Sequence, residues 1–277
     1  MNAVDEHYRQ DALLSRIEAG LAAAGVTGPL SVEALAPVDE FHTGGRPATE
    51  HVLDHLDLHA NDRVLDVGCG IGGAARLCAE RHGCEVVGVD LTESFVATAQ
   101  ALTERVGLAD RVQFLTADAT ALDPGLIGDG FAAAYQLHVG MNIADKAAHL
   151  TGLANAVRPG GRIGIYDLML TDTGSLDDLD HPLPWVSEAA ENMIAPVGAY
   201  HDAVAAAGLD LHLVDDRSEP VMAAMLAAQA ASADSGGPPP LGVHLLMGDT
   251  AGLKFANMMA AFRAGRIAPV LIVAMRR

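Results

Sequence analysis

Short apolar runs alternate with longer amphipathic stretches through the first 170 residues of the chain. Each run is a few residues long and nearly free of charge, which is typical of strands covered on both faces, as in parallel sheets. The predicted strands are 64–67, 85–90, 112–117, 131–137 and 163–167. Between them, apolar residues at helical spacing predict helices at 74–82 and 92–105. The alternation predicts an α/β fold, because crossover helices connect parallel strands.

The rest of the chain predicts the completion of this sheet and a cover above it. A helix at 199–208, a strand at 209–215 and a final strand at 268–275 extend the pattern. Residues 171–198 and 218–266 carry apolar side chains, several of them methionines, outside that pattern. We expect these segments to form a mainly helical cap, since methionine adapts to irregular apolar ligands. The same surface can instead be plain core or a homodimer interface.

The most informative stretch is 64–73, where the first strand breaks into glycines. Gly68, Gly70 and Gly73 match the G-x-G-x-x-G spacing of dinucleotide-binding loops, and Asp90 follows 20 residues after Gly70. Glycines let the backbone turn tightly and approach a ligand closely. This spacing by itself is a weak signal, so a dinucleotide enzyme stays open at this point.

Three further residues favour a different cofactor. Gly72 lies in the loop, Asp66 stands two residues before Gly68, and Asp118 follows the third predicted strand. This set resembles the class I S-adenosylmethionine (SAM) methyltransferases, and 155–162 is similar to the L-x-P-G-G turn that leads into their fifth strand. The resemblance implies a doubly wound, Rossmann-like, seven-stranded and mostly parallel sheet, with its last strand antiparallel.

The resemblance also implies the roles of individual residues. In that family, the acidic glycine loop wraps the methionine part of SAM, the acid ending the second strand binds the ribose, and the acid after the third approaches the adenine. These roles pass to Asp66 with the glycines, to Asp90 and to Asp118. The predicted cofactor-binding set is Arg46, Asp66, Gly68, Cys69, Gly70, Gly72, Asp90, Leu91, Asp118, Ala119 and Gln136.

A second resemblance lies upstream, in 37–49. This glycine-containing loop is similar to the H-x-G-G-R-x-A-T segment of bacterial sarcosine/dimethylglycine N-methyltransferases, and the similarity covers roughly residues 35–170. Arg46 is a candidate ligand for the methionine carboxylate of SAM, because guanidinium groups bind carboxylates bidentately. The alternative is a solvated loop cation.

Charge narrows the possible partners. The chain has 36 Asp and Glu against 17 Lys and Arg, a formal net charge of −19 at pH 7. Such a field repels phosphate backbones, so no nucleic-acid partner is expected. Charged residues near the N-terminus leave no signal-peptide core, and no later run has the length to cross a bilayer. We therefore expect no membrane contact and a cytoplasmic location.

Histidines and cysteines invite metal hypotheses that the sequence does not favour. His51, His55 and His59 recur every four residues, which predicts three imidazoles along one helix face. A tetrahedral site needs a fourth ligand, so we interpret them as a solvated face. Cys69, Cys78 and Cys84 lack a C-x-x-C pair or a distant partner and are interpreted as reduced packing residues. We predict no metal.

The fourth predicted strand delivers His138 at its carboxyl end, where open parallel sheets place their ligands. Its imidazole, with an ordinary pKa of about 6.5, is the group there best suited to be a catalytic base. The alternative is a histidine that only packs or hydrogen-bonds beneath the cofactor. The predicted acceptor-binding set is Tyr8, His138, Met141, Trp185 and Met247.

The acceptor itself is only partly constrained. No N-P-P-Y-like tetrapeptide follows the fourth strand, which argues against methylation of nucleobases or glutamine amides. The predicted cap holds few cations, with Lys254, Arg263 and Arg266 near its end, so a strongly anionic acceptor is not expected. Here the chain departs from the N-methyltransferase pattern. Nitrogen, oxygen and carbon acceptors stay open, with nitrogen favoured by the resemblance alone.

These observations predict a SAM-dependent methyltransferase acting on a small, partly apolar metabolite. The alternatives are a SAM-binding enzyme of cyclase or lyase type on the same fold and a non-catalytic SAM-binding scaffold. The predicted divisions are an N-terminal helical lid (1–50), the SAM-binding core (51–170), a cap insert (171–198), a core continuation (199–217), a second cap insert (218–266) and the final strand (267–277).

Overall fold

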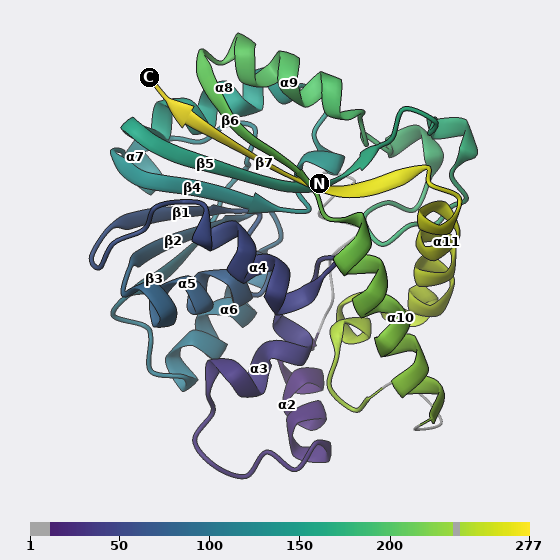
Figure 1. Ribbon diagram of the computed structural model, residues 1–277. Coiled ribbons are helices and arrows are strands. Elements are labelled where there is room, and N and C mark those ends of the chain that lie inside the picture. Colours follow the sequence, from purple (N-terminus) through teal and green to yellow (C-terminus); the bar gives the residue numbers. More distant parts are fainter. Residues whose placement is uncertain (1–11, 235–238) are drawn as a thin grey trace.

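The computed structural model describes residues 12–234 and 239–277, and seven strands of this part form one sheet in the order β3-β2-β1-β4-β5-β7-β6 (Figure 1). The strands are β1 (Arg63–Val67), β2 (Glu85–Asp90), β3 (Val112–Thr116), β4 (Phe131–Leu137), β5 (Val157–Leu170), β6 (Leu209–Asp216) and β7 (Ile267–Arg276). Neighbouring strands are parallel except at β7, which is antiparallel to β5 and β6. The predicted doubly wound sheet is confirmed, including its antiparallel last strand.

Helices cover both faces of this sheet (Figure 1). Successive side chains of a strand point to opposite faces, so Val64 packs with α4, α5 and α6 while its neighbour Leu65 packs with α8 and α9. These flanking helices are α4 (Gly45–Asp54), α5 (Gly73–His82), α6 (Glu93–Arg105), α7 (Pro124–Ile127), α8 (Lys146–Ala156) and α9 (Val197–Ala206). The uncharged runs therefore form strands because both of their faces are buried.

Four more helices gather beyond the sheet layer: α2 (Leu13–Ala23), α3 (Val32–Asp39), α10 (Ser218–Asp234) and α11 (Ala251–Arg263) (Figure 1). Ile17 of α2 and Leu35 of α3 share a buried cluster with Leu246. Trp185 and Met258 of α11 belong to another cluster, which includes Met141 after β4. The two cap segments are thus joined to the end of β4 by apolar packing.

Several boundaries differ from the sequence prediction. Residues 37–49 are not one loop, because α3 extends to Asp39 and α4 begins at Gly45. Segment 171–198 is mostly irregular, with two short 3-10 turns at Leu176–Asp178 and Ala189–Glu191, so the helical part of the cap lies in 218–266. The prolines and aspartates of 171–198 favour turns over helix.

The three spaced histidines do not share one helix face. Helix α4 ends at Asp54, and Asp57 has a left-handed φ of 56°, so His59 lies beyond the helix. His51 Nε2 lies 2.8 Å from Asp215 Oδ2, and His55 Nδ1 lies 2.8 Å from the carbonyl oxygen of His51. In the described part of the chain, no three His, Cys, Asp or Glu residues are grouped so as to hold a metal ion. No helix there has the length and apolarity needed to span a membrane.

Candidate functional site

A cavity of about 570 Å³ opens at the carboxyl ends of β1, β2 and β4. Its polar lining comes from α3, α4 and the loops that follow β1 to β4, and these elements also contribute apolar residues. The cap contributes apolar residues only. This is the edge where open parallel sheets place their ligands, and the volume suits a small-molecule site. Of the sequence-predicted residues, the lining includes Arg46, Asp66, Gly68, Cys69, Gly70, Asp90, Leu91, Asp118, Ala119, His138, Met141, Trp185 and Met247.

The glycine loop is fixed from both sides. The N–H groups of Gly68 and Cys69 donate to the Val89 carbonyl, at 2.8 and 3.0 Å. Gly68 has φ of 70°, and a Cβ on it would overlap the side chain of Val139. Gly70, with φ of 53°, has open space at the same position. Only a glycine suits the first position, because both its conformation and its neighbours exclude a side chain.

Asp90, the last residue of β2, and Asp118, two residues after β3, organise the adjoining turns. Asp90 accepts from the N–H of Gly70 through Oδ2 and from the N–H of Thr92 through Oδ1, each at 2.9 Å. Asp118 Oδ1 accepts from the N–H and the hydroxyl of Thr120, at 2.8 and 2.7 Å. Both acids line the cavity while holding a backbone turn.

Asp66 is the buried acid of the loop. Its side chain is almost fully buried on the cavity wall. Burial raises the pKa of its carboxyl to about 8; the Tyr135 hydroxyl opposes this shift and the charge of Asp90 adds to it. A ligand that brings positive charge beside this carboxyl stabilises its ionised form.

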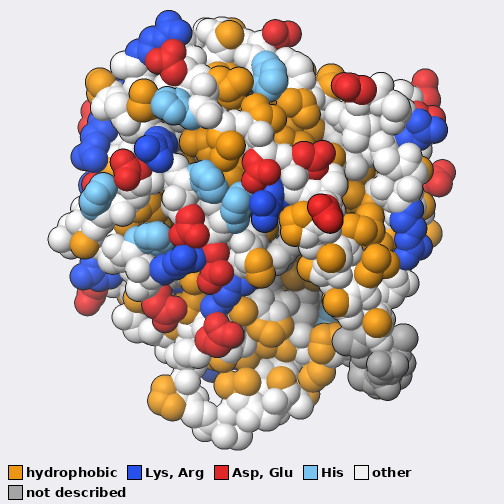
Figure 2. Space-filling view, in the orientation of Figure 1, with side chains coloured by type: hydrophobic (Ala, Val, Ile, Leu, Met, Phe, Trp, Pro, Cys, Tyr) orange, Lys and Arg blue, Asp and Glu red, His pale blue; other side chains and the backbone are white. Residues whose placement is uncertain are grey.

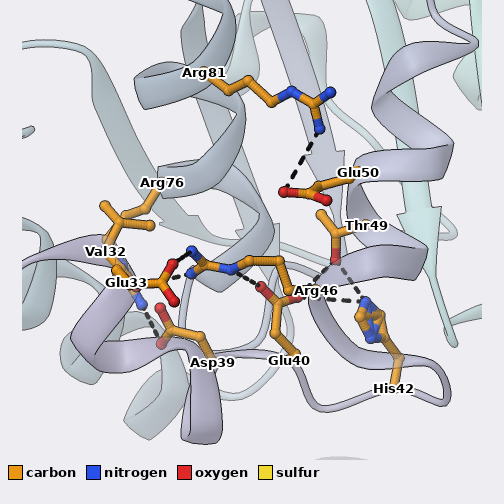
Figure 3. Close-up of polar contacts among 10 residues, drawn as sticks. All are labelled: Val32, Glu33, Asp39, Glu40, His42, Arg46, Thr49, Glu50, Arg76 and Arg81. Atoms are coloured by element: carbon orange, nitrogen blue, oxygen red, sulfur yellow. Dashed lines mark hydrogen bonds and ion pairs between the residues drawn. The ribbon is translucent and has the colours of Figure 1, made fainter. Parts of the chain in front are cut away.

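Arg46 is engaged by protein groups (Figure 3). Its Nη1 atom lies 2.6 Å from Glu33 Oε2, its Nη2 atom donates to the Val32 carbonyl at 2.8 Å, and its Nε atom lies 3.5 Å from Glu40 Oε1. The side chain lines the cavity but is only 15% exposed. Neither interpretation from sequence described these contacts, because they depend on the packing of α3 against α4.

A second polar cluster lies beside Arg46 (Figure 3). The Thr49 hydroxyl donates to Glu40 Oε2 at 2.6 Å, and His42 Nε2 lies 2.8 Å from the same hydroxyl oxygen. Burial raises the pKa of Glu40 to about 7 and lowers the pKa of His42 to about 4. His42 is therefore a neutral imidazole at neutral pH. The sequence analysis named none of the three as a site residue, although His42 and Thr49 belong to the segment that carried the resemblance.

His138 lies where the sequence predicted it, immediately after β4. Its backbone has a left-handed φ of 59°, its ring stacks on Tyr166 with centroids 5.7 Å apart, and its Nε2 atom lies 3.0 Å from the Thr43 hydroxyl. Burial lowers the pKa of His138 well below its usual value. The ring is thus neutral and fixed in orientation.

Three residues of the predicted set are not found in the lining that the structure describes: Gln136, Gly72 and Tyr8. Gln136 is fully buried beneath the cavity and does not line it. Gly72 is the N-cap of α5, where its φ of 85° and the ring of Phe114 exclude a side chain, and it does not line the cavity either. Tyr8 lies outside the described residues.

Gln136 instead links two loops through a buried chain of hydrogen bonds. Its amide nitrogen donates to Asp167 Oδ2 at 2.9 Å, and its amide oxygen lies 2.6 Å from His149 Nε2. His149 Nδ1 lies 3.0 Å from the carbonyl oxygen of Ala119, so both ring nitrogens face acceptors. Neutral imidazole has only one N–H group. Either His149 therefore carries a second proton, or the Gln136 amide is rotated so that its NH₂ group faces His149.

Asp167 anchors the loop that carries His138. Its Oδ1 atom accepts from the N–H groups of Val139 and Gly140, at 2.9 and 3.2 Å, and its Oδ2 atom also accepts from the Tyr200 hydroxyl at 3.0 Å. This role was not predicted from the sequence. The available signal was the acid that ends the predicted strand 163–167, the same kind of signal that singled out Asp90.

Comparison with known proteins agrees with this geometry. The family model described as a methyltransferase domain matches residues 64–161, which contain the glycine loop and the acids after β2 and β3. The methyltransferase GfsG of Streptomyces halstedii is 31% identical over 184 residues, covering 66% of this chain and 65% of that protein. Residues 64–161 of the chain therefore form a methyltransferase domain.

Solved structures share the fold of this methyltransferase domain. A putative sarcosine dimethylglycine methyltransferase from Galdieria sulphuraria matches with a TM-score of 0.66 at 16% identity, covering 83% of this chain and 85% of that one. The [4+2]-cyclase SpnF matches with a TM-score of 0.65 at 20% identity, covering 99% and 96%. At these identities the likeness concerns the fold alone. The methyltransferase match to GfsG spans 65% of that protein, just under two thirds of its length.

Proposed function

We propose that this protein transfers the methyl group of SAM to a small metabolite with a partly apolar body. The observation that carries the proposal is a single cavity bounded on one side by the cofactor loop with its acids and on the other by a cap that contributes only apolar residues. A methyl donor and an acceptor held against each other in one cavity meet the main requirement of the reaction, which is alignment.

The core side of the cavity fits the cofactor on grounds independent of the family match. The buried Asp66 carboxyl lies on its wall, where a ligand with a positive centre stabilises the ionised form, and the loop beside it turns through glycines with positive φ at 68 and 70. Asp90 and Asp118 keep their proposed roles toward ribose and adenine, and Cys69, Gly70, Leu91 and Ala119 their proposed contacts. When bound, SAM supplies a methyl group already activated on a sulfonium. Gly72 and Gln136 are proposed to support the site from beneath.

Arg46 keeps its proposed role toward the methionine carboxylate. Its guanidinium already faces two carboxylates, Glu33 and Glu40, so an incoming carboxylate has to displace one of them. Glu33 is the better candidate for displacement, because its side chain is 82% exposed whereas that of Glu40 is 4% exposed. Exposed ion pairs contribute little energy, so the exchange costs little.

His138, which lines the cavity, keeps its proposed role as the base that takes the acceptor's proton. Its lowered pKa leaves the ring unprotonated at neutral pH but makes it a weak base in the free protein, and Tyr166 and Thr43 hold it in place. A nitrogen acceptor that is already an uncharged amine needs no such base. The acceptor atom, for which the resemblance favours nitrogen, is left to experiment.

The direct test is mass spectrometry of host metabolites incubated with the protein and SAM. We expect one metabolite to gain a single methyl group while S-adenosylhomocysteine accumulates in equal amount. Asp90→Ala is the matched control, because it removes a proposed cofactor contact and lies outside the cap. S-adenosylhomocysteine formation that is the same with and without extract would contradict transfer to a metabolite.

A second candidate function is a SAM-binding enzyme that rearranges its substrate without methylating it. The fold match to a [4+2]-cyclase over nearly the whole chain favours keeping this candidate. The same incubation separates the two, because a cyclase changes the retention time of a metabolite without a mass gain and without S-adenosylhomocysteine. A homodimer and a cytoplasmic location stay predictions, and light scattering of the purified protein tests the first.

A further inference from the structure

We propose that the acceptor is an uncharged, lipophilic molecule and that the cavity excludes phosphorylated acceptors. The inference deepens the proposed methyl transfer and rests on it. It starts from the cap half of the cavity, to which α10, the turn at 243–246 and α11 contribute only apolar residues. Figure 2 shows hydrophobic side chains gathered over α10.

The wall is built from thioethers and aromatic rings. Met225, Met247 and Met258 line it together with Trp185 and Phe255. Trp185 donates its Nε1–H to Asn192 at 3.0 Å, so its one polar group is already satisfied within the protein. Methionine adapts to irregular apolar shapes and contacts aromatic rings favourably, which suits a carbon skeleton and not a charged headgroup.

Each lysine and arginine in the described part of the cap contacts another group of the protein. Lys254 is buried, and its Nζ atom lies 3.5 Å from the Met247 carbonyl oxygen. Arg263 donates to Gln229 at 3.2 Å, and Arg266 donates to the Thr173 carbonyl. Lys146, near Met141, donates to the carbonyls of Ile143 and Met193 at 2.9 and 2.8 Å. These side chains already bind groups of the protein and are therefore not available to a ligand.

The cavity lining therefore offers a phosphate almost nothing. Among the described residues, Arg46 is the only lysine or arginine in the lining, and its proposed partner there is the methionine carboxylate of the bound cofactor. Five acids line the same cavity: Asp39, Glu40, Asp66, Asp90 and Asp118. A phosphate monoester carries about 1.5–2 negative charges at pH 7 and normally requires arginine, lysine or a metal ion. Burying it here leaves an unpaired charge, which is strongly unfavourable.

Three probes that share an octyl chain and differ in their head group test the inference. Their binding is measured by calorimetry on the protein saturated with S-adenosylhomocysteine. Octan-1-ol is expected to bind, octyl phosphate to bind at least about 100-fold more weakly, and octylamine also more weakly than the alcohol. Octyl phosphate or octylamine binding as tightly as the alcohol would overturn the inference, and so would failure of the alcohol to bind. Failure of S-adenosylhomocysteine itself to bind contradicts the proposed function instead.

A matched pair of variants gives the converse test. Ala228 is an exposed residue of α10 that lines the cavity, and its neighbour Ala227 is exposed but does not line it. Ala228→Arg is expected to strengthen octyl phosphate binding at least about tenfold, because one guanidinium pairs with the phosphate, whereas Ala227→Arg adds the same charge without that effect. Equal effects of the two variants would mean that net charge, and not the lining, governs binding.

Discussion

The carboxylate of Asp90 accepts a hydrogen bond from the backbone N–H of Gly70, at 2.9 Å. The two residues lie 20 positions apart, one at the end of β2 and the other inside the glycine loop after β1. The bond joins the two signatures that first suggested a nucleotide cofactor. Asp90 therefore shapes the loop as well as facing the cavity.

Asp90→Ala should weaken SAM binding roughly ten- to a hundredfold, because a hydrogen bond to a charged group contributes about 1.5–3 kcal/mol. Isothermal titration calorimetry measures the change. Asp90→Asn is the matched variant, since it keeps one acceptor oxygen, and it should fall between wild type and Asp90→Ala. Unchanged affinity in a folded Asp90→Ala protein would remove this residue from the site.

Gly68→Ala should cost more stability and more cofactor affinity than Gly70→Ala. Both positions have positive φ, a conformation that costs a residue with a side chain about 1–3 kcal/mol, but only the Cβ at Gly68 overlaps Val139. Urea unfolding and calorimetry with SAM compare the pair. Equal losses at the two positions would show that backbone conformation alone matters and that the contact with Val139 does not.

SAM binding near pH 7 should release protons from the protein. The pKa of Asp66 is raised to about 8 by burial, so the free protein holds this carboxyl largely protonated, and a cation placed beside it lowers the pKa. Calorimetry in buffers of different ionisation enthalpy measures the protons released. Asp66→Asn should remove most of this release. Binding enthalpies that do not depend on the buffer would contradict this.

Asp167→Asn should be tolerated, whereas Asp167→Ala should destabilise the protein by roughly 3 kcal/mol or more. Asparagine keeps an oxygen for the N–H groups of Val139 and Gly140, and its NH₂ group faces Gln136 once that amide turns around. Alanine leaves these buried donors without partners, at about 1–3 kcal/mol each. Urea unfolding measures the stability of the two variants. Similar losses of stability in both would mean that the charge of Asp167 is required.

His138→Ala should lower turnover by roughly 10²–10⁴ and leave SAM affinity nearly unchanged. Because burial lowers the pKa of His138 well below its usual value, the ring stays neutral from about pH 6 to 8 and should add no pH dependence there. Steady-state kinetics across this range, with calorimetry for SAM, measure both effects. A parallel fall in SAM affinity would make His138 a cofactor contact, and normal turnover would mean that the acceptor arrives already deprotonated.

The sequence by itself determined the sheet and the position of the cofactor loop. Strands buried on both faces must be almost wholly apolar, and a loop with φ of 70° beside Val139 must use glycine, so these features leave a mark within a few residues. The acids Asp66, Asp90 and Asp118 could be named for the same reason, since each lies at or within two residues of the carboxyl end of a strand.

Only the tertiary structure decided which polar groups the cavity still offers. Arg46 is paired by Glu33 and Glu40, Gln136 is buried against Asp167, and Lys254 turns to a carbonyl. The availability of a charged group depends on what else lies within about 4 Å of it, and those neighbours come from distant parts of the chain. Local patterns therefore identify the residues of a site, whereas packing decides which of them remain free to bind.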